Sequence, residues 1–179
     1  LHRFGAGAVM AVNRLLFLSG HCIPFILTGQ EFGAVNRPSI HERMGTCDKG
    51  PRVVDADTSS DQPGVEFEGN IFARGREARQ EWYWFYRTLV HLRRHTPELT
   101  RGAFSWIDVG EHAEPASRTV VAFERRLNHS IVRCAVNLGP EPRSLERSEW
   151  FGGPALYGSL AEGALEPFAA IVVRVTSET

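Results

Sequence analysis

The chain has 179 residues, 42% of them hydrophobic, and its formal net charge is −1. That length accommodates one domain or pieces of two, and no apolar run reaches the roughly 18 residues that a membrane-spanning helix needs. The 20 basic and 21 acidic side chains are interspersed along the chain, so we expect neither a membrane protein nor the basic face of a nucleic-acid-binding protein.

The first predicted element is a helix over residues 6–18. Gly20 stands just after it, where a glycine commonly ends a helix. The apolar side chains of this helix cover a surface wider than a single amphipathic stripe: Val9, Met10, Val12, Leu15, Leu16, Phe17 and Leu18. Such a helix should therefore pack on more than one neighbouring element.

An apolar segment of strand length, Pro24–Thr28, comes next and runs directly into Gly29, Gln30 and Glu31. A continuous apolar run suits a parallel strand that is buried on both faces. In α/β proteins such strands present polar side chains at their carboxyl ends. We therefore predict a buried strand with a functional site after it, formed by Gln30 and Glu31.

Residues 34–76 form a long segment with little periodicity, which is typical of a functional or disordered connection. Part of it has the spacing of a calcium-binding EF-hand loop, with Asp55, Asp57, Ser59, Asp61 and Glu66 at the ligand positions. The glycine that such a loop requires at its sixth position is Ser60 here, and Pro63-Gly64 follows where a helix should begin. A solvated acidic loop is the favoured interpretation over calcium binding, and no cofactor is expected.

Helical periodicity returns from about Arg76. Basic residues occupy its last turn at Arg93, Arg94 and His95, and Pro97 is predicted to end it. Its apolar side chains recur at three- and four-residue steps: Trp82, Phe85, Tyr86, Leu89 and Leu92. This spacing directs Trp82 into the core, and it leaves open which of Tyr83 and Trp84 is exposed.

After Gly102 the pattern changes to short β runs, with turn residues at 127–129 between two of them. The predicted strands are residues 103–109, 119–125, 131–137, 155–160 and 168–175. Several short strands at this spacing are typical of an antiparallel β-sandwich. The predicted fold class is thus α/β followed by all-β, with the boundary near Leu99–Gly102.

Three cysteines, Cys22, Cys47 and Cys134, are widely spaced and form no Cys-x-x-Cys pair. An odd number of isolated cysteines argues against a disulfide framework or a zinc site. Free thiols suit a reducing compartment, which favours the cytoplasm.

Two blocks of the sequence resemble the end of the catalytic barrel in the α-amylase family of retaining α-glucosidases. The first is Arg3-Phe4-Gly5 with the helix that follows and the segment Pro24–Gly33; the second is Phe85–Leu99. In that family a seventh helix leads to an eighth strand with the pattern Gly-x-Pro-Phe-Ile-x-x-Gly-x-Glu-x-Gly. An eighth helix then closes the (β/α)8 barrel before a C-terminal β-sandwich. Here Cys22-Ile23-Pro24 stands in place of Gly-x-Pro.

The resemblance implies that residues 1–100 are the C-terminal segment of a (β/α)8 (TIM) barrel and that residues 101–179 are a β-sandwich domain. It implies a fragment of a glycoside hydrolase or transglycosidase acting on α-glucosidic bonds. The family's three catalytic carboxylates lie on the fourth, fifth and seventh strands, so none is expected in this chain. Its partners would be an oligo- or polysaccharide substrate and the missing N-terminal barrel portion.

The resemblance also places candidate substrate-binding residues on the catalytic face: Arg3, Gln30, Glu31, Asn36 and Arg37. Gln30 and Glu31 could bind sugar hydroxyls or orient catalytic groups, or they could serve only to bind backbone amides at the strand end. Arg3 could pair with an acidic group near the active site or form a surface ion pair. A non-catalytic carbohydrate-binding or scaffold protein of the same fold is the alternative function.

Overall fold

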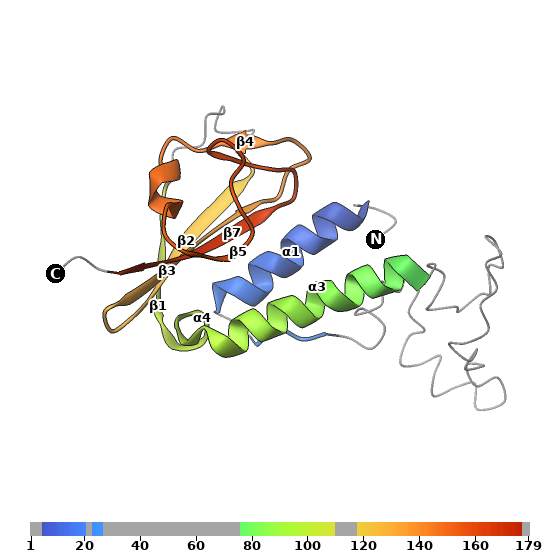
Figure 1. Cartoon of the computed structure of the whole chain (residues 1–179), viewed down its shortest axis with the longest axis horizontal. Helices are drawn as coiled ribbons and strands as arrows, with labels where there is room; N and C mark the ends of the chain where they lie inside the picture. Colours follow the sequence, from blue (N-terminus) through green and yellow to red (C-terminus); the bar gives the residue numbers. More distant parts are fainter. Residues whose placement is uncertain (1–4, 21–22, 27–75, 110–117, 177–179) are drawn as a thin grey trace. The chain divides into compact units, whose positions relative to one another are not determined.

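The computed structural model of the chain describes residues 5–20, 23–26, 76–109 and 118–176 (Figure 1). The chain divides into two compact units, one made of residues 1–24 and 88–179 and the other of residues 25–87. Helix α3 (Arg76–His95) begins in the second unit and ends in the first. The predicted domain boundary near Leu99–Gly102 stays a prediction.

Helix α1 (Gly5–Ser19) confirms the first predicted helix. It ends where Gly20 adopts a left-handed backbone conformation with φ of +72°, which a glycine accepts without the steric cost that a Cβ atom brings. Ala11 and Leu18 are fully buried in the core, whereas Val12 and Leu16 are exposed. The apolar surface of α1 is therefore only partly used by the described residues.

Helix α3 confirms the second predicted helix and ends at His95. Pro97 does not simply stop it, because this proline is the first residue of a short helix, α4 (Pro97–Arg101). A proline is tolerated there because the first turn of a helix does not use its backbone N–H groups internally. No helix in the described part of the chain is long and apolar enough to span a membrane.

The aromatic side chains of α3 divide as its periodicity predicts. Trp82 is 1% exposed, which confirms its inward orientation. Its ring is stacked with that of Tyr86 and meets that of Phe85 edge to face. Tyr83 and Trp84 are both exposed, so the helix carries aromatic surface that its own buried face does not use.

The C-terminal half forms an antiparallel β domain, as predicted. A five-stranded sheet has the order β1-β2-β3-β7-β5. Its strands are β1 (Ala103–Trp106), β2 (Val120–Leu127), β3 (Ser130–Asn137), β7 (Ala170–Thr176) and β5 (Ala155–Tyr157). The second sheet pairs β4 (Arg143–Ser144) with β6 (Ala164–Leu165). With only two residues each, β4 and β6 are too short to show an alternating pattern.

The turn between β2 and β3 lies at Asn128 and His129, within the predicted turn. Leu127 pairs with Ser130 across it, so the loop has two residues. Asn128 adopts a φ of +54°, a conformation in which asparagine is enriched among the non-glycine residues. The turn therefore fixes the register of the whole β2–β3 hairpin.

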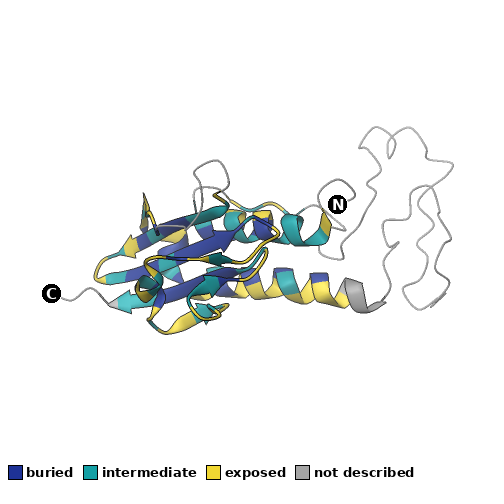
Figure 2. Cartoon of the chain, turned by 90° about the horizontal axis from the view of Figure 1, so that it is seen from above, coloured by how far each residue is buried: buried dark blue, intermediate teal, exposed yellow. Residues whose placement is uncertain are grey.

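The two faces of the five-stranded sheet bury different cores. Val132, Cys134 and Val136 of β3 face α1, the end of α3 and α4, together with Ala11, Leu18, Leu92 and Leu99. Ala135 of β3 faces the other way, into a cluster with Leu145, Phe151 and Leu165 that lie in or next to β4, β6 and the 3-10 helix η4 (Ser148–Phe151). Figure 2 shows the resulting band of buried residues along the strands.

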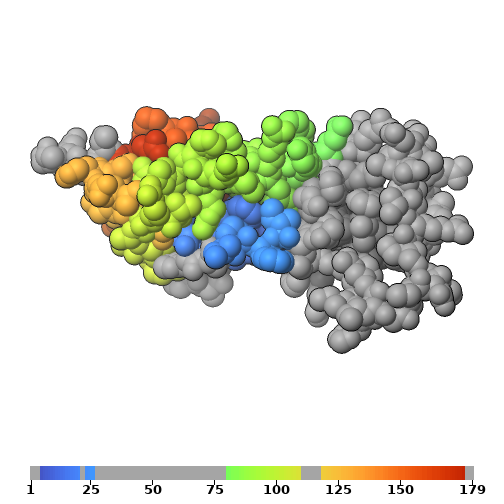
Figure 3. Space-filling model, turned by 90° about the horizontal axis from the view of Figure 1, so that it is seen from below, coloured from blue at the N-terminus to red at the C-terminus, as the bar shows by residue number. Residues whose placement is uncertain are grey.

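The predicted strand over Pro24–Thr28 is not formed in its described part. Residues 23–26 lie outside any helix or strand. Ile23 and Phe25 are 91% and 80% exposed, and the blue segment to which they belong lies at the surface in Figure 3. The other residues of the predicted strand are outside the described part of the chain. A strand needs a neighbouring strand to take up its backbone hydrogen bonds, and residues 23–26 pair with no strand in the described part of the chain.

Two glycines with the same backbone conformation distinguish the cost of backbone strain from the cost of steric clashes with neighbouring atoms. Gly5 and Gly20 both have a positive φ, of +75° and +72°. A Cβ atom at Gly5 would meet nothing within 4 Å, whereas at Gly20 it would clash with the backbone oxygen of Leu99 and the guanidinium of Arg125. We predict that Gly5→Ala lowers the free energy of unfolding by about 1 kcal/mol and Gly20→Ala by about 2–4 kcal/mol.

Urea denaturation monitored by circular dichroism measures both values. Equal losses in the two variants would contradict the packing of α1 against α4 and β2 that this difference reflects.

Candidate functional site

The five candidate substrate-binding residues, Arg3, Gln30, Glu31, Asn36 and Arg37, all lie outside the described residues and stay predictions. The acidic loop of residues 55–66, Cys22 and Cys47 lie outside them as well. Within the described part of the chain, no group of three or more His, Cys, Asp or Glu side chains could bind a metal ion. The described residues do contain buried polar clusters, centred on Glu98 and Asn137.

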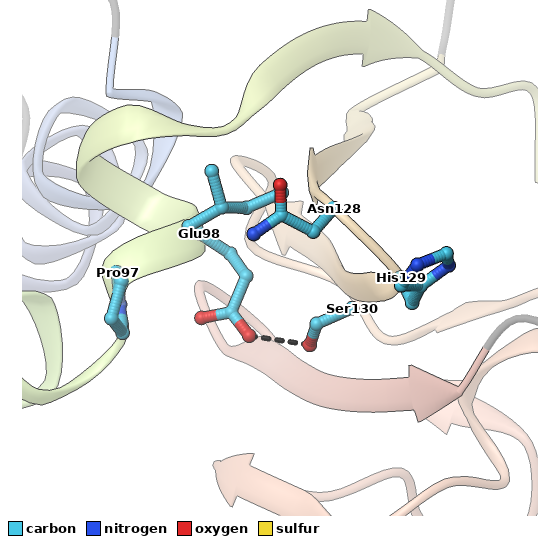
Figure 4. A pocket seen from close by; sticks show the side chains of 6 residues that line it. Pro97, Glu98, Asn128, His129 and Ser130 are labelled. Carbon is cyan, nitrogen blue, oxygen red and sulfur yellow. Dashed lines mark hydrogen bonds between the residues drawn. The ribbon is translucent and has the colours of Figure 1, made fainter.

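The strongest polar cluster is centred on Glu98, in the first turn of α4. Its carboxylate accepts a hydrogen bond from the Ser130 hydroxyl at 2.5 Å, shown as a dashed line in Figure 4. The Arg174 guanidinium donates two more, from Nε to Oε1 at 3.1 Å and from Nη2 to Oε2 at 3.3 Å. Glu98 is only 5% exposed, whereas the Arg174 side chain is 39% exposed, so the carboxylate of this bidentate ion pair is shielded from water and the guanidinium is only partly so.

The backbone of Glu98 is bound as tightly as its side chain. Its carbonyl oxygen accepts the amide of Gly102 at 2.9 Å and Nε of Arg125 at 3.2 Å. Arg125 is 4% exposed and its guanidinium carbon lies 5.8 Å from the centre of the Phe104 ring. Burial, followed by the positive charge of Arg93, lowers the pKa of Arg125. One residue of α4 thus contacts β2, β3 and β7.

Two opposing effects set the pKa of the Glu98 carboxyl. Burial raises it, but hydrogen bonds from Ser130, from the backbone amide of Glu98 and from Arg174 outweigh burial, so the pKa lies below its ordinary value. Glu98 is therefore ionised at neutral pH. A carboxylate whose oxygens are already occupied by an arginine and a serine is unsuited to donate a proton or to attack a substrate, so this cluster joins α4 to the sheet.

An open depression of about 440 Å³ lies beside this cluster. It is lined by Pro97, Glu98, Leu127, Asn128, His129 and Ser130 (Figure 4). The one charged carboxylate in its lining, Glu98, is already paired with Arg174. The depression therefore lacks the two independent carboxyl groups that glycoside hydrolysis requires.

A second buried polar group, Asn137, fixes the loop after β3. Its Oδ1 accepts hydrogen bonds from Thr119 and from the amide of Gly139, and its Nδ2 donates to the carbonyl of Glu141 at 2.7 Å. The side chain is fully buried, so these bonds replace those that it would make with water. Asn137 thus has a structural role.

Sequence reasoning missed the Glu98 cluster because its members are 32 and 76 residues apart. One signal was present in the strands. Arg125 lies two positions after the buried Phe123, and Arg174 lies two positions after the buried Val172. An arginine in phase with core positions must find an acidic or carbonyl partner.

Comparison with solved structures reveals the same fold in larger enzymes. The trehalulose synthase MutB from Pseudomonas mesoacidophila MX-45 is 20% identical, with a TM-score of 0.59 over 94% of this chain and 38% of that chain. The isomaltulose synthase PalI from Klebsiella sp. LX3 is 16% identical, with a TM-score of 0.57 over 94% of this chain and 38% of that one.

A MutB variant in complex with Tris is 19% identical, with a TM-score of 0.60, and covers 97% of this chain. This chain spans about 40% of the length of the structures that it matches. No protein-family model and no curated protein matches the sequence.

The low pKa of Glu98 predicts the sign of one pH effect on stability. The ion pair stabilises the fold fully above the unfolded pKa, near 4.5, and this contribution is lost as the pH falls through the folded pKa. We predict that Glu98→Gln lowers the free energy of unfolding by about 1–3 kcal/mol at pH 7 and makes stability less dependent on pH below 4.5.

Glu141→Gln is the matched control, because Glu141 pairs with Arg143 while its own side chain is 69% exposed. Its expected cost is below about 0.5 kcal/mol. Urea titrations at pH 7 and at pH 3–4 test both variants, and equal costs at pH 7 would contradict the central role of Glu98.

Proposed function

We propose that this chain, which has the fold of a C-terminal part of α-amylase-family glycoside hydrolases, belongs to an enzyme that hydrolyses or transfers α-glucosidic bonds. The observation that supports this proposal is the extent of the match, which covers 97% of this chain but only 40% of the enzyme's. One of the similar structures is a MutB variant in complex with its substrate sucrose. A small α-glucoside such as sucrose is therefore the substrate to test first.

In this proposal residues 1–100 supply the last β/α unit of a barrel and residues 101–179 supply its C-terminal β domain. The order of α1, the apolar segment from residue 23 and α3 fits a helix–strand–helix unit. The exposure of Ile23 and Phe25 supports it further, because apolar side chains of a barrel strand become buried only when the neighbouring strands are present.

The proposed enzyme would take its acid/base and its nucleophile from other parts of the barrel. Of the described carboxylates, Glu98 is the most deeply buried, and its pairing with Arg174 leaves it no chemical role. Substrate contacts from this chain would come from Arg3, Gln30, Glu31, Asn36 and Arg37. The chain by itself would therefore bind sugar weakly and catalyse nothing.

The alternative is a carbohydrate-binding or scaffold protein of the same fold without catalytic carboxylates. Exposed aromatic side chains, which can stack on sugar rings, support this alternative. Trp84 is 55% exposed and Trp106 is 66% exposed, and an indole offers a flat apolar face with a polar edge to a bound ring. Binding without turnover would distinguish this alternative from the enzyme.

The test begins with the gene sequence upstream of the codon for Leu1. We expect it to encode further β/α units with carboxylates after the fourth, fifth and seventh strands. The longer protein should then turn over sucrose, maltose or an aryl α-glucoside, and the 179-residue chain should not. In the family that this chain resembles the fourth-strand carboxylate is the nucleophile, so replacing it by alanine should abolish turnover by a retaining mechanism.

Turnover by the 179-residue chain alone would refute the proposed division of labour. A longer protein that lacks the carboxylates and yet binds maltose, measured by calorimetry, would establish the alternative.

A further inference from the structure

We propose that His91 and His95 form a two-histidine binding site for a divalent transition-metal ion on the surface of α3. The two residues are four positions apart on one helix, which places their side chains one above the other on the same face. Both side chains are exposed. This site is independent of the proposed glycosidase function.

The two imidazole rings already lie at nearly the separation that a shared metal ion requires. Their centres are 4.0 Å apart and their planes are inclined by 31°. A metal ion bound at about 2.0–2.1 Å from one nitrogen of each ring, at a nitrogen–metal–nitrogen angle of about 90–109°, would place the two ring centres about 4.5–5.2 Å apart. In the proposed complex the two exposed side chains turn so that one nitrogen of each ring faces the ion.

The hydrogen bonding of His95 prepares it as a ligand. Its Nδ1 lies 2.8 Å from the carbonyl oxygen of His91. A carbonyl only accepts hydrogen bonds, so Nδ1 carries the proton, and in the neutral ring the lone pair is then on Nε2. A ring nitrogen bound in this way to a backbone carbonyl is the usual support of a metal-binding histidine. The backbone of the helix thus orients the ring of His95.

Nearby arginines lower the affinity of the site for a metal ion without occupying the site. Arg87, one turn before His91, lies over the ring of Trp84, with its guanidinium carbon 4.8 Å from the ring centre. Arg93 donates to the carbonyl of Phe17 at 2.6 Å. Arg94 is exposed and lies between the two histidines in sequence, so its charge lowers the affinity for any cation.

The ligand chemistry selects the class of metal. Neutral imidazoles bind Cu²⁺, Ni²⁺ and Zn²⁺, and affinities in such sites rise from Ni²⁺ to Cu²⁺ and fall again at Zn²⁺. Two protein ligands fill only part of the coordination sphere, so water completes it. Calcium and magnesium, which prefer oxygen ligands, should not bind here.

Calorimetric titration of the 179-residue chain with CuCl₂, NiCl₂ and ZnCl₂ at neutral pH tests the site. Of the three metal ions, we expect Cu²⁺ to bind with the highest affinity. His91→Gln and His95→Gln should each weaken Cu²⁺ binding at least about tenfold, because even the loss of a supporting residue outside the ligand set costs that much. Circular dichroism should show unchanged helix content, since both side chains are exposed.

The matched control is His129→Gln, which removes an exposed histidine from the β2–β3 turn and should leave Cu²⁺ affinity unchanged. Metal should also raise the melting temperature of the wild-type chain and not that of His95→Gln, because binding across one turn stabilises the helix. Unchanged affinity in both α3 variants, or an equal loss in His129→Gln, would overturn the proposal.

Discussion

The burial of both faces of strands β3 and β7 is the constraint on which the rest of the structure depends. Side chains alternate along a strand, so Val132 and Val172 face one core while Ala135 and Val173 face the other. A sheet that is apolar on both sides needs a cover on each side. Helices α1 and α4 with the end of α3 provide one cover, and β4, β6 and η4 provide the other.

The face of the sheet that α4 covers carries two arginines, of which Arg125 is buried and Arg174 is partly exposed. An unpaired guanidinium would be costly at the buried Arg125 and less so at Arg174. Glu98 binds both arginines: its carboxylate accepts a hydrogen bond from Arg174 and its backbone carbonyl accepts one from Arg125. The position of α4 on the sheet is therefore determined by polar groups as much as by Leu99.

The described polar clusters maintain the fold and supply none of the chemistry that the similar enzymes perform. Glu98 and Asn137 are both saturated with hydrogen bonds inside the protein. A shared fold does not by itself transfer an activity. Among the described residues, exposed aromatic and histidine side chains gather on α3: Tyr83, Trp84, His91 and His95.

The sequence by itself determined the features that depend on neighbours along the chain. The end of α1 at Gly20, the inward side of α3 at Trp82 and the turn at Asn128 follow from local backbone preferences and from periodicity, which operate within a few residues. The five longer strands were visible for the same reason.

Only the tertiary structure decided the pairing of Glu98 with Ser130 and Arg174, the short strands β4 and β6, and the unpaired conformation of residues 23–26. Each of these depends on which distant segment lies alongside, and no local pattern encodes that choice.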